Sequence, residues 1–233
     1  MSHSPVRPTV IPYITAREGE EGELESKFGV LPNMKGLRYL DETPEDRDER
    51  GVLWARCSQS LLDGEPTGKP RWREVHPLRQ RETMSRLRCQ VGRGPASRTK
   101  KGFLFLASPL PNGSSEPSWP EGLLTVQPPV CLKHAGLSVR ECAHLGRAGH
   151  VAIRVRQPRL YGVFGTYYAL NPGKGLIALP HGDEGRALRY GDPLAGWYLA
   201  SQLVCELSGV SIVDLQAELA DADRHADRLG SCP

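Results

Sequence analysis

The sequence predicts an α+β fold in which a small antiparallel sheet is accompanied by C-terminal helices. Residues 151–156 alternate apolar and basic side chains, a period of two that is typical of a half-buried strand. Residues 75–145 follow the order helix, turn, strand, loop, strand, helix. Two apolar segments near the C-terminus begin at capping residues, Asp192 before Pro193 and Ser211 before Asp214, which indicates two helices.

The remaining elements follow from local patterns. Thr43 before Pro44 is a helix start, because threonine caps and proline suits the first helical position. We expect, in order, a short helix Pro44–Arg50, strand Val52–Ala55, a helix from Val75, strands Gly102–Ala107 and Leu123–Val126, helix Leu132–Leu145, a meander over 150–181, helix Leu194–Leu207 and a last helix to about Leu229. The predicted domains are an N-terminal arm and acidic region (1–70), a central unit (71–149), and the meander with the C-terminal helices (150–233).

Composition bounds the class of protein. At 233 residues the chain can bury one sizeable core, and its 39% apolar and 24% charged residues are ordinary for a globular protein. No segment has the length of a signal peptide's apolar run or the roughly 18 apolar residues of a membrane span. The six cysteines are too widely spaced for a small disulfide scaffold. We therefore expect a cytoplasmic protein with reduced thiols and no membrane contact.

Charge is unevenly distributed along the chain, although the net charge is only +3. Residues 16–65 hold thirteen acidic against seven basic side chains, whereas residues 69–102 hold eleven basic against two acidic. Such a basic segment is typical of a surface that meets nucleic acid or an acidic protein surface, and two solvated faces of opposite sign explain it as well. The residues predicted to contact nucleic acid are Arg79, Arg81, Arg86, Arg88, Arg93, Arg98, Lys100 and Lys101.

Three side chains have the spacing of metal ligands. Cys131 and His134 are separated by two residues at the start of a predicted helix, and Cys89 lies in a glycine-rich turn. Structural zinc sites use such pairs, because a tight turn directs both side chains inward. Gly92 stands where the turn's second thiolate is expected, so the motif is three-quarters present. The sequence therefore predicts a treble-clef-like zinc unit held by Cys89, Cys131 and His134.

The fourth ligand stays open at this point. His76, Cys57, Cys142 and His144 are the candidate replacements. Cys142 and His144 follow His134 by more than two helical turns, roughly 12 Å at 1.5 Å per residue, which is too far to share one ion along an unbroken helix. Water is the other option, and would give the three-ligand site that catalytic zinc uses.

The segments RLRCQVGRGPASR, GFLFL, WPEGLLTVQPPVCLKHAGLSVRECAHL and GHVAIRV resemble an uncharacterised actinobacterial protein family. Its members carry Cys-Gln-Val-Cys-Gly at the first knuckle and a Cys-x₂-Cys-like pair at the second, so Cys89, Cys131 and His134 match ligand positions and Gly92 departs. The resemblance covers roughly residues 52–219. More loosely, the unit resembles the scaffold of HNH nucleases, which need an Asp-His or His-His pair on the intervening hairpin. This chain has no histidine between Gly92 and Cys131.

No other constellation indicates catalysis, because the chain has neither a G-x-S-x-G elbow nor a P-loop. We therefore expect a non-catalytic zinc-site protein that acts as a binding or regulatory module, with nucleic acid as a candidate partner. The alternative is a metal-dependent enzyme with an open-coordinated zinc, or a degenerate HNH-type nuclease relative.

Overall fold

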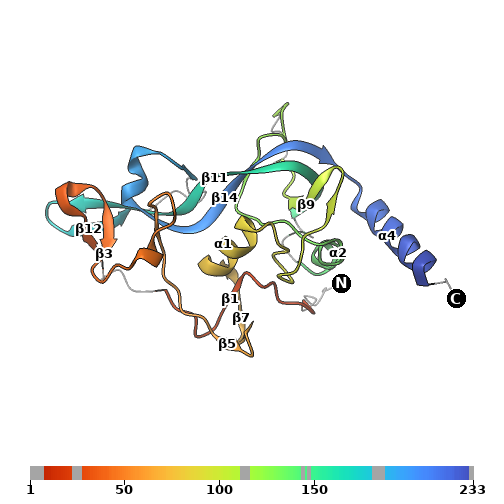
Figure 1. Cartoon of the computed structure of the whole chain (residues 1–233), viewed down its shortest axis with the longest axis horizontal. Helices are drawn as coiled ribbons and strands as arrows, with labels where there is room; N and C mark the ends of the chain where they lie inside the picture. Colours follow the sequence, from red (N-terminus) through yellow and green to blue (C-terminus); the bar gives the residue numbers. More distant parts are fainter. Residues whose placement is uncertain are drawn as a thin grey trace, which may run out of the picture. The chain divides into compact units, whose positions relative to one another are not determined.

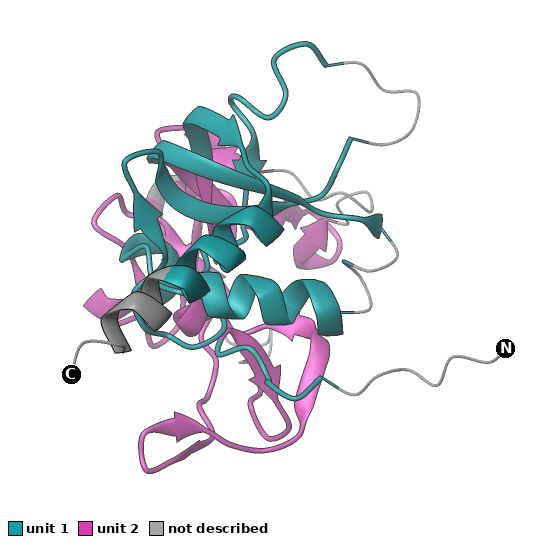
Figure 2. Cartoon of the chain, turned by 90° about the vertical axis from the view of Figure 1, so that its right-hand side faces the viewer, with its two compact units in different colours: residues 1–13, 83–159, 206–233 teal, residues 14–82, 160–205 magenta. Residues whose placement is uncertain are grey.

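The structure of the chain is a computed structural model that describes residues 8–22, 28–110, 116–142, 145, 148–179 and 187–230. The chain divides into two compact units, each assembled from segments that are distant in sequence (Figure 2). Unit 1 consists of residues 1–13, 83–159 and 206–233, and unit 2 of residues 14–82 and 160–205. The sequence predicted three contiguous domains, whereas these units are interleaved.

Unit 1 contains a short hairpin, three further strand segments and two helices (Figure 1). Its elements are β8 (Arg98–Thr99), β9 (Gly102–Ala107), β10 (Leu124–Thr125), α2 (Leu132–Glu141), α4 (Leu215–Gly230), and parts of β11 (Val151–Asn171) and β14 (Tyr198–Ile212). Strand β9 pairs antiparallel with the first residues of β11, with Ala107 opposite Val151 and Phe103 opposite Val155. The strand predicted at Gly102–Ala107 and the last helix are therefore confirmed.

The hydrophobic core of unit 1 lies between β9, β11 and the two helices. Cys89, Leu104, Val130, Ala135 and Ala152 are buried there, together with Val91 and Leu215. Helices α2 and α4 pack closely, because Gly136 has no side chain and a Cβ there would lie 3.1 Å from a methyl group of Leu219. This core fixes the start of α2 beside the turn that carries Cys89.

Unit 2 consists mainly of short strands. Its elements are β1 (Thr15–Arg17), β2 (Phe28–Val30), β3 (Leu37–Tyr39), β4 (Leu53–Trp54), β5 (Leu61–Leu62), β6 (Glu65–Pro66), β7 (Pro70–Val75), most of α1 (Pro77–Ser85), β12 (Gly175–Leu179), β13 (Leu188–Arg189), the rest of β11 and β14, and the 3₁₀ helices Pro32–Met34, Pro44–Asp46 and Pro193–Trp197. Leu37, Tyr39, Leu53 and Tyr168 form a buried cluster in this unit.

The strands of the main sheet follow the order β10-β14-β11-β9-β8, with β12 and β13 paired to β11 and β4 paired to β14. Strands β11 and β14 are the longest, at 21 and 15 residues, and each contributes residues to both units. The fold is thus α+β as predicted, but the sheet has eight strands and is not small. Asn171 closes the predicted turn between β11 and β12 by accepting hydrogen bonds from Gly173 and Lys174.

The predicted helix Leu194–Leu207 is wrong. Asp192 does cap a helix, since its side chain accepts a hydrogen bond from the Leu194 N–H, but that helix is a 3₁₀ turn that ends at Trp197. Residues 198–212 form strand β14, and Cys205, expected on a helix, is buried on this strand. An apolar run of this length does not separate helix from buried strand by periodicity alone, and sheet partners on both sides decided it.

Candidate metal centre

Cys89 lies in a tight turn that begins just after α1. The Cys89 N–H donates to the Gly94 carbonyl at 2.8 Å, and the Arg93 N–H donates back to the Cys89 carbonyl at 2.8 Å. The turn is also joined to residues 128–130, since the Gln90 N–H donates to the Pro129 carbonyl at 3.0 Å. The Cys89 side chain is only 1% exposed and belongs to the core of unit 1. The hydrogen bonds of the turn and the burial of the side chain therefore fix the position of the Cys89 sulfur.

Cys131 and His134 come from the first turn of α2. Cys131 is the N-cap residue, with φ −80° and ψ 159°, and its Sγ accepts the His134 N–H at 3.5 Å. Cys131 enters this position because Val130 is fixed on both sides, donating to the Leu104 carbonyl and accepting from the Ser97 N–H. Capping by a sulfur uses one of the N–H groups that every helix start leaves without an intrahelical acceptor.

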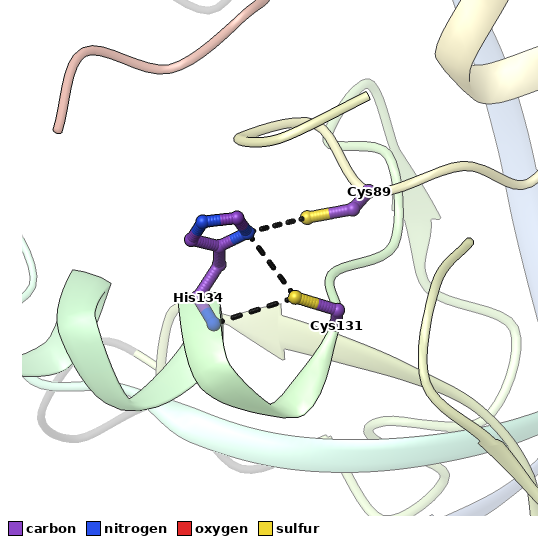
Figure 3. Close-up of side chains that lie close together, drawn as sticks. All are labelled: Cys89, Cys131 and His134. Atoms are coloured by element: carbon purple, nitrogen blue, oxygen red, sulfur yellow. Dashed lines mark hydrogen bonds between the residues drawn. The ribbon is translucent and has the colours of Figure 1, made fainter. Parts of the chain in front are cut away.

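The three side chains converge from these two elements (Figure 3). His134 Nδ1 lies 3.1 Å from Cys131 Sγ and 3.4 Å from Cys89 Sγ, and all three donor atoms lie within 4.8 Å of one another. Tetrahedral zinc, with Zn–S near 2.3 Å and Zn–N near 2.0 Å, separates sulfur and nitrogen ligands by roughly 3.5 Å. The donor atoms therefore stand at nearly the separation that one ion requires.

Hydrogen bonds to sulfur favour the charged form of one thiol. The Cys131 thiol and the backbone N–H groups of Cys131, Gly92 and Val91 lower the pKa of Cys89 to about 5, against the opposing effect of burial. The pKa of Cys131 is raised, first because its thiol donates to the Cys89 thiolate and then because it is buried. The two pKa values move in opposite directions because two like charges at this distance would repel each other.

The structure gives a steric reason for glycine at position 92 that the sequence did not suggest. Its φ is not in the left-handed region, so it is not required by turn conformation. A Cβ placed on Gly92 would lie 2.3 Å from Cε1 and 2.9 Å from Nδ1 of His134. The imidazole of His134 thus fills the space that a side chain at position 92 would need. Spacing alone gave no signal of this, because the two residues are 42 positions apart.

Of the four candidate replacement ligands, the three that the structure describes do not join this group. Among the described residues, only Cys89, Cys131 and His134 form a cluster of metal-capable side chains. Cys142 is the C-cap residue of α2, at the opposite end of the helix from the cluster. His76 and Cys57 belong to unit 2. His144 lies outside the described residues.

The predicted nucleic-acid-binding residues fall into two groups. Arg79 is 1% exposed in unit 2 and pairs with Glu20 at 2.5 Å, so it cannot reach a phosphate. Arg81, also in unit 2, stacks over the ring of Trp54 at 4.4 Å. The others belong to unit 1, in the metal-site turn and the β8–β9 hairpin that follows it: Arg86, Arg88, Arg93, Arg98, Lys100 and Lys101. The sequence pattern did not separate these groups, because burial is a tertiary property.

A buried charge network in unit 2 was missed entirely. Glu20 is 2% exposed and accepts hydrogen bonds from Arg79 at 2.5 and 2.7 Å and from the Arg17 N–H at 2.6 Å. His76, fully buried beside it, donates through Nε2 to the Ser58 carbonyl at 3.0 Å, and burial lowers its pKa. No sequence motif links Glu20 to Arg79, which follows it by 59 residues.

No family model, curated protein or solved structure matches the chain. The family resemblance and the looser resemblance to HNH nucleases accordingly stay predictions. None of the helices that the structure describes is both long enough and apolar enough to cross a membrane.

Proposed function

We propose that unit 1 is a non-catalytic zinc-binding module that contacts nucleic acid. The observation that carries the first part is the convergence of Cys89, Cys131 and His134 from a turn and a helix start. A thiolate-rich set with one imidazole suits Zn²⁺ better than Mg²⁺ or Ca²⁺, which prefer oxygen ligands. The elements that hold the donors (a turn, the β8–β9 hairpin and then α2) are in the order of a treble clef, which we propose as the local fold.

A binding role is favoured over hydrolysis because the described cluster lacks a general base. A catalytic zinc needs a carboxylate or a histidine within hydrogen-bond reach of the reacting water. Within the part of the chain that the structure describes, no Asp, Glu or second His belongs to the cluster. The enzyme alternative is supported by one observation, the count of three protein donors, which is the number that open zinc sites use.

Contact with nucleic acid is supported by the positions of the exposed basic side chains. Arg86, Arg98, Lys100 and Lys101 are all exposed, and all belong to the same unit as the metal site. Three acidic residues of segment 16–65 have their basic partners within unit 2: Glu20 pairs with Arg79, Glu42 with Arg47 and Asp46 with Arg56. Exposed basic side chains that are clustered attract phosphates, because binding releases counterions from the nucleic acid.

Metal analysis of the purified chain tests the first part. One zinc per chain is expected, with loss of zinc in Cys89→Ser, Cys131→Ser and His134→Ala. Cys142→Ser is the matched control, since Cys142 is a half-exposed cysteine of the same helix region that lies outside the cluster. Equal zinc content in all four variants would contradict the assignment.

Gel-shift titration against duplex DNA and single-stranded RNA at two salt concentrations tests the second part. Binding should weaken steeply with salt, and reversal of Arg98, Lys100 and Lys101 to Glu should abolish it. Lys174→Glu, an exposed lysine of unit 2, is the control and should change affinity little. Binding that responds equally to both changes, or is absent at low salt, would refute contact through unit 1.

A further inference from the structure

We propose that the metal held by Cys89, Cys131 and His134 keeps its fourth coordination position for an exogenous thiolate from a small soluble thiol. The inference rests on the proposed metal binding and adds a ligand for the same site. It has three supports: the competition between position 92 and His134 for one volume, which leaves three donors, the exposure of the open side, and the charge around it.

The first support is that a second thiolate in the turn and the imidazole of His134 exclude each other. A Cβ on residue 92 would overlap His134 Cε1 at 2.3 Å, well inside any real carbon–carbon contact. The imidazole therefore replaces a ligand at position 92 and is not added to it. The described residues therefore supply three donors, Cys89, Cys131 and His134, to an ion that takes four.

The second support is access. Gly92 is exposed, and Cys131 and His134 are half-buried, so the cluster borders solvent although Cys89 beneath it is buried. We therefore expect a small molecule to reach the metal from the side that Gly92 borders. A closed structural site, in contrast, would have its fourth ligand supplied from the turn.

The third support is the charge around the site. Lys133 is exposed and lies between the two α2 ligands, and the site stands at the N-terminus of a ten-residue helix, where the helix dipole favours an anion. Two thiolates balance the charge of Zn²⁺, so an anionic fourth donor is held only where such positive potential exists. Among anions, a thiolate matches the soft donor set already present, whereas carboxylate and phosphate are hard oxygen donors.

The exchange is simple ligand substitution. The incoming thiol loses its proton to solvent, its sulfur forms one bond to the metal, and the solvent molecule at that position leaves. No oxidant or reductant is required, and Cys89, Cys131 and His134 stay bound throughout.

Cobalt substitution of the full chain tests this proposal, because Co²⁺ takes tetrahedral sulfur sites and absorbs visible light. We expect the thiolate-to-cobalt band of the loaded protein to rise from the intensity of two thiolates to that of three when 2-mercaptoethanol is added. The rise should saturate, and acetate and inorganic phosphate at equal concentration should leave the band unchanged. A fourfold donor set supplied by the protein would give no response to the thiol.

Variants at positions 92 and 134 test whether a side chain at position 92 and the imidazole of His134 compete for the same space. Gly92→Ala should lower cobalt affinity at least tenfold, because its methyl group displaces the imidazole. Gly94→Ala is the matched control, since a Cβ there meets only the Gly92 carbonyl at 3.8 Å. Gly92→Cys combined with His134→Ala should restore the affinity that His134→Ala loses, because the vacated volume accepts the new thiolate. Restoration does not require Gly92→Ala to fold, so it tests the exchange independently.

The possible failures are distinguishable. If cobalt does not bind at all, the proposed metal binding fails. If cobalt binds but the thiol leaves the band unchanged or removes the metal, the open position is refuted while metal binding stands. A change in the thiol-free spectrum on His144→Ala or Cys232→Ser would likewise refute it, by revealing a fourth donor from the chain.

Discussion

Replacing Glu20 by Gln should destabilise unit 2 strongly. Glu20 is 2% exposed and its partner Arg79 is 1% exposed, joined by two hydrogen bonds of 2.5 and 2.7 Å. The pKa of Glu20 is lowered: burial opposes its charge and is the largest single effect, but the hydrogen bonds from Arg79 and from the Arg17 N–H, with the nearby positive charge, together outweigh it. The amide would leave the buried guanidinium without its counter-charge, next to the positive charge of Arg17. Loss of one partner of such a buried pair costs about 3–5 kcal/mol.

Urea unfolding followed by tryptophan fluorescence measures this loss. Trp54, Trp72 and Trp197 belong to unit 2, so the signal reports chiefly on that unit. Glu21→Gln removes the same charge from an exposed neighbour and should change the free energy of unfolding by less than about 0.5 kcal/mol. Replacing Glu20 and Arg79 together by Met should recover most of the loss, because neither member of the pair is then left buried without its partner and only the Arg17 guanidinium stays buried there. A cost below about 1 kcal/mol for Glu20→Gln would match an exposed ion pair and refute the reasoning.

Two further predictions concern other ion pairs. Glu218→Gln should lower the stability of unit 1 by about 2 kcal/mol, since its partner Arg154 is 1% exposed and pairs with it at 2.5 Å. Asp221→Asn, on the exposed face of α4, should change stability little. Thermal unfolding followed by circular dichroism measures both, and equal costs would contradict the pairing. The Arg56 guanidinium lowers the pKa of Asp46 to about 2, below its value in the unfolded chain. Asp46 should therefore contribute about 2 kcal/mol to the free energy of unfolding above pH 4, and this contribution should be lost as the pH falls toward 2. Asp46→Asn should flatten that part of the stability–pH curve, and an unchanged curve would refute the prediction.

Local sequence determined those parts of the fold that short-range physics can fix. Strand β9 follows from the apolar run of residues 102–107, and α2 starts where Cys131 can cap it. The last helix follows from its amphipathic pattern and from Asp214, which accepts hydrogen bonds from Gln216 and Ala217. The three candidate donors could be selected because Cys131 and His134 have the two-residue spacing of metal ligands and Cys89 lies in a glycine-rich turn.

Tertiary structure alone decided what depends on neighbours that are distant in sequence. Residues 198–212 are a strand because β11 and β10 flank them, although their apolar pattern is equally compatible with a buried helix. Arg79 is removed from the basic surface by Glu20, 59 residues earlier. Gly92 is explained by the imidazole of His134, which no local pattern could place. In each case the deciding interaction is a contact between residues that are distant in sequence and meet only once the chain has folded. Such a contact produces no local or periodic pattern in the sequence.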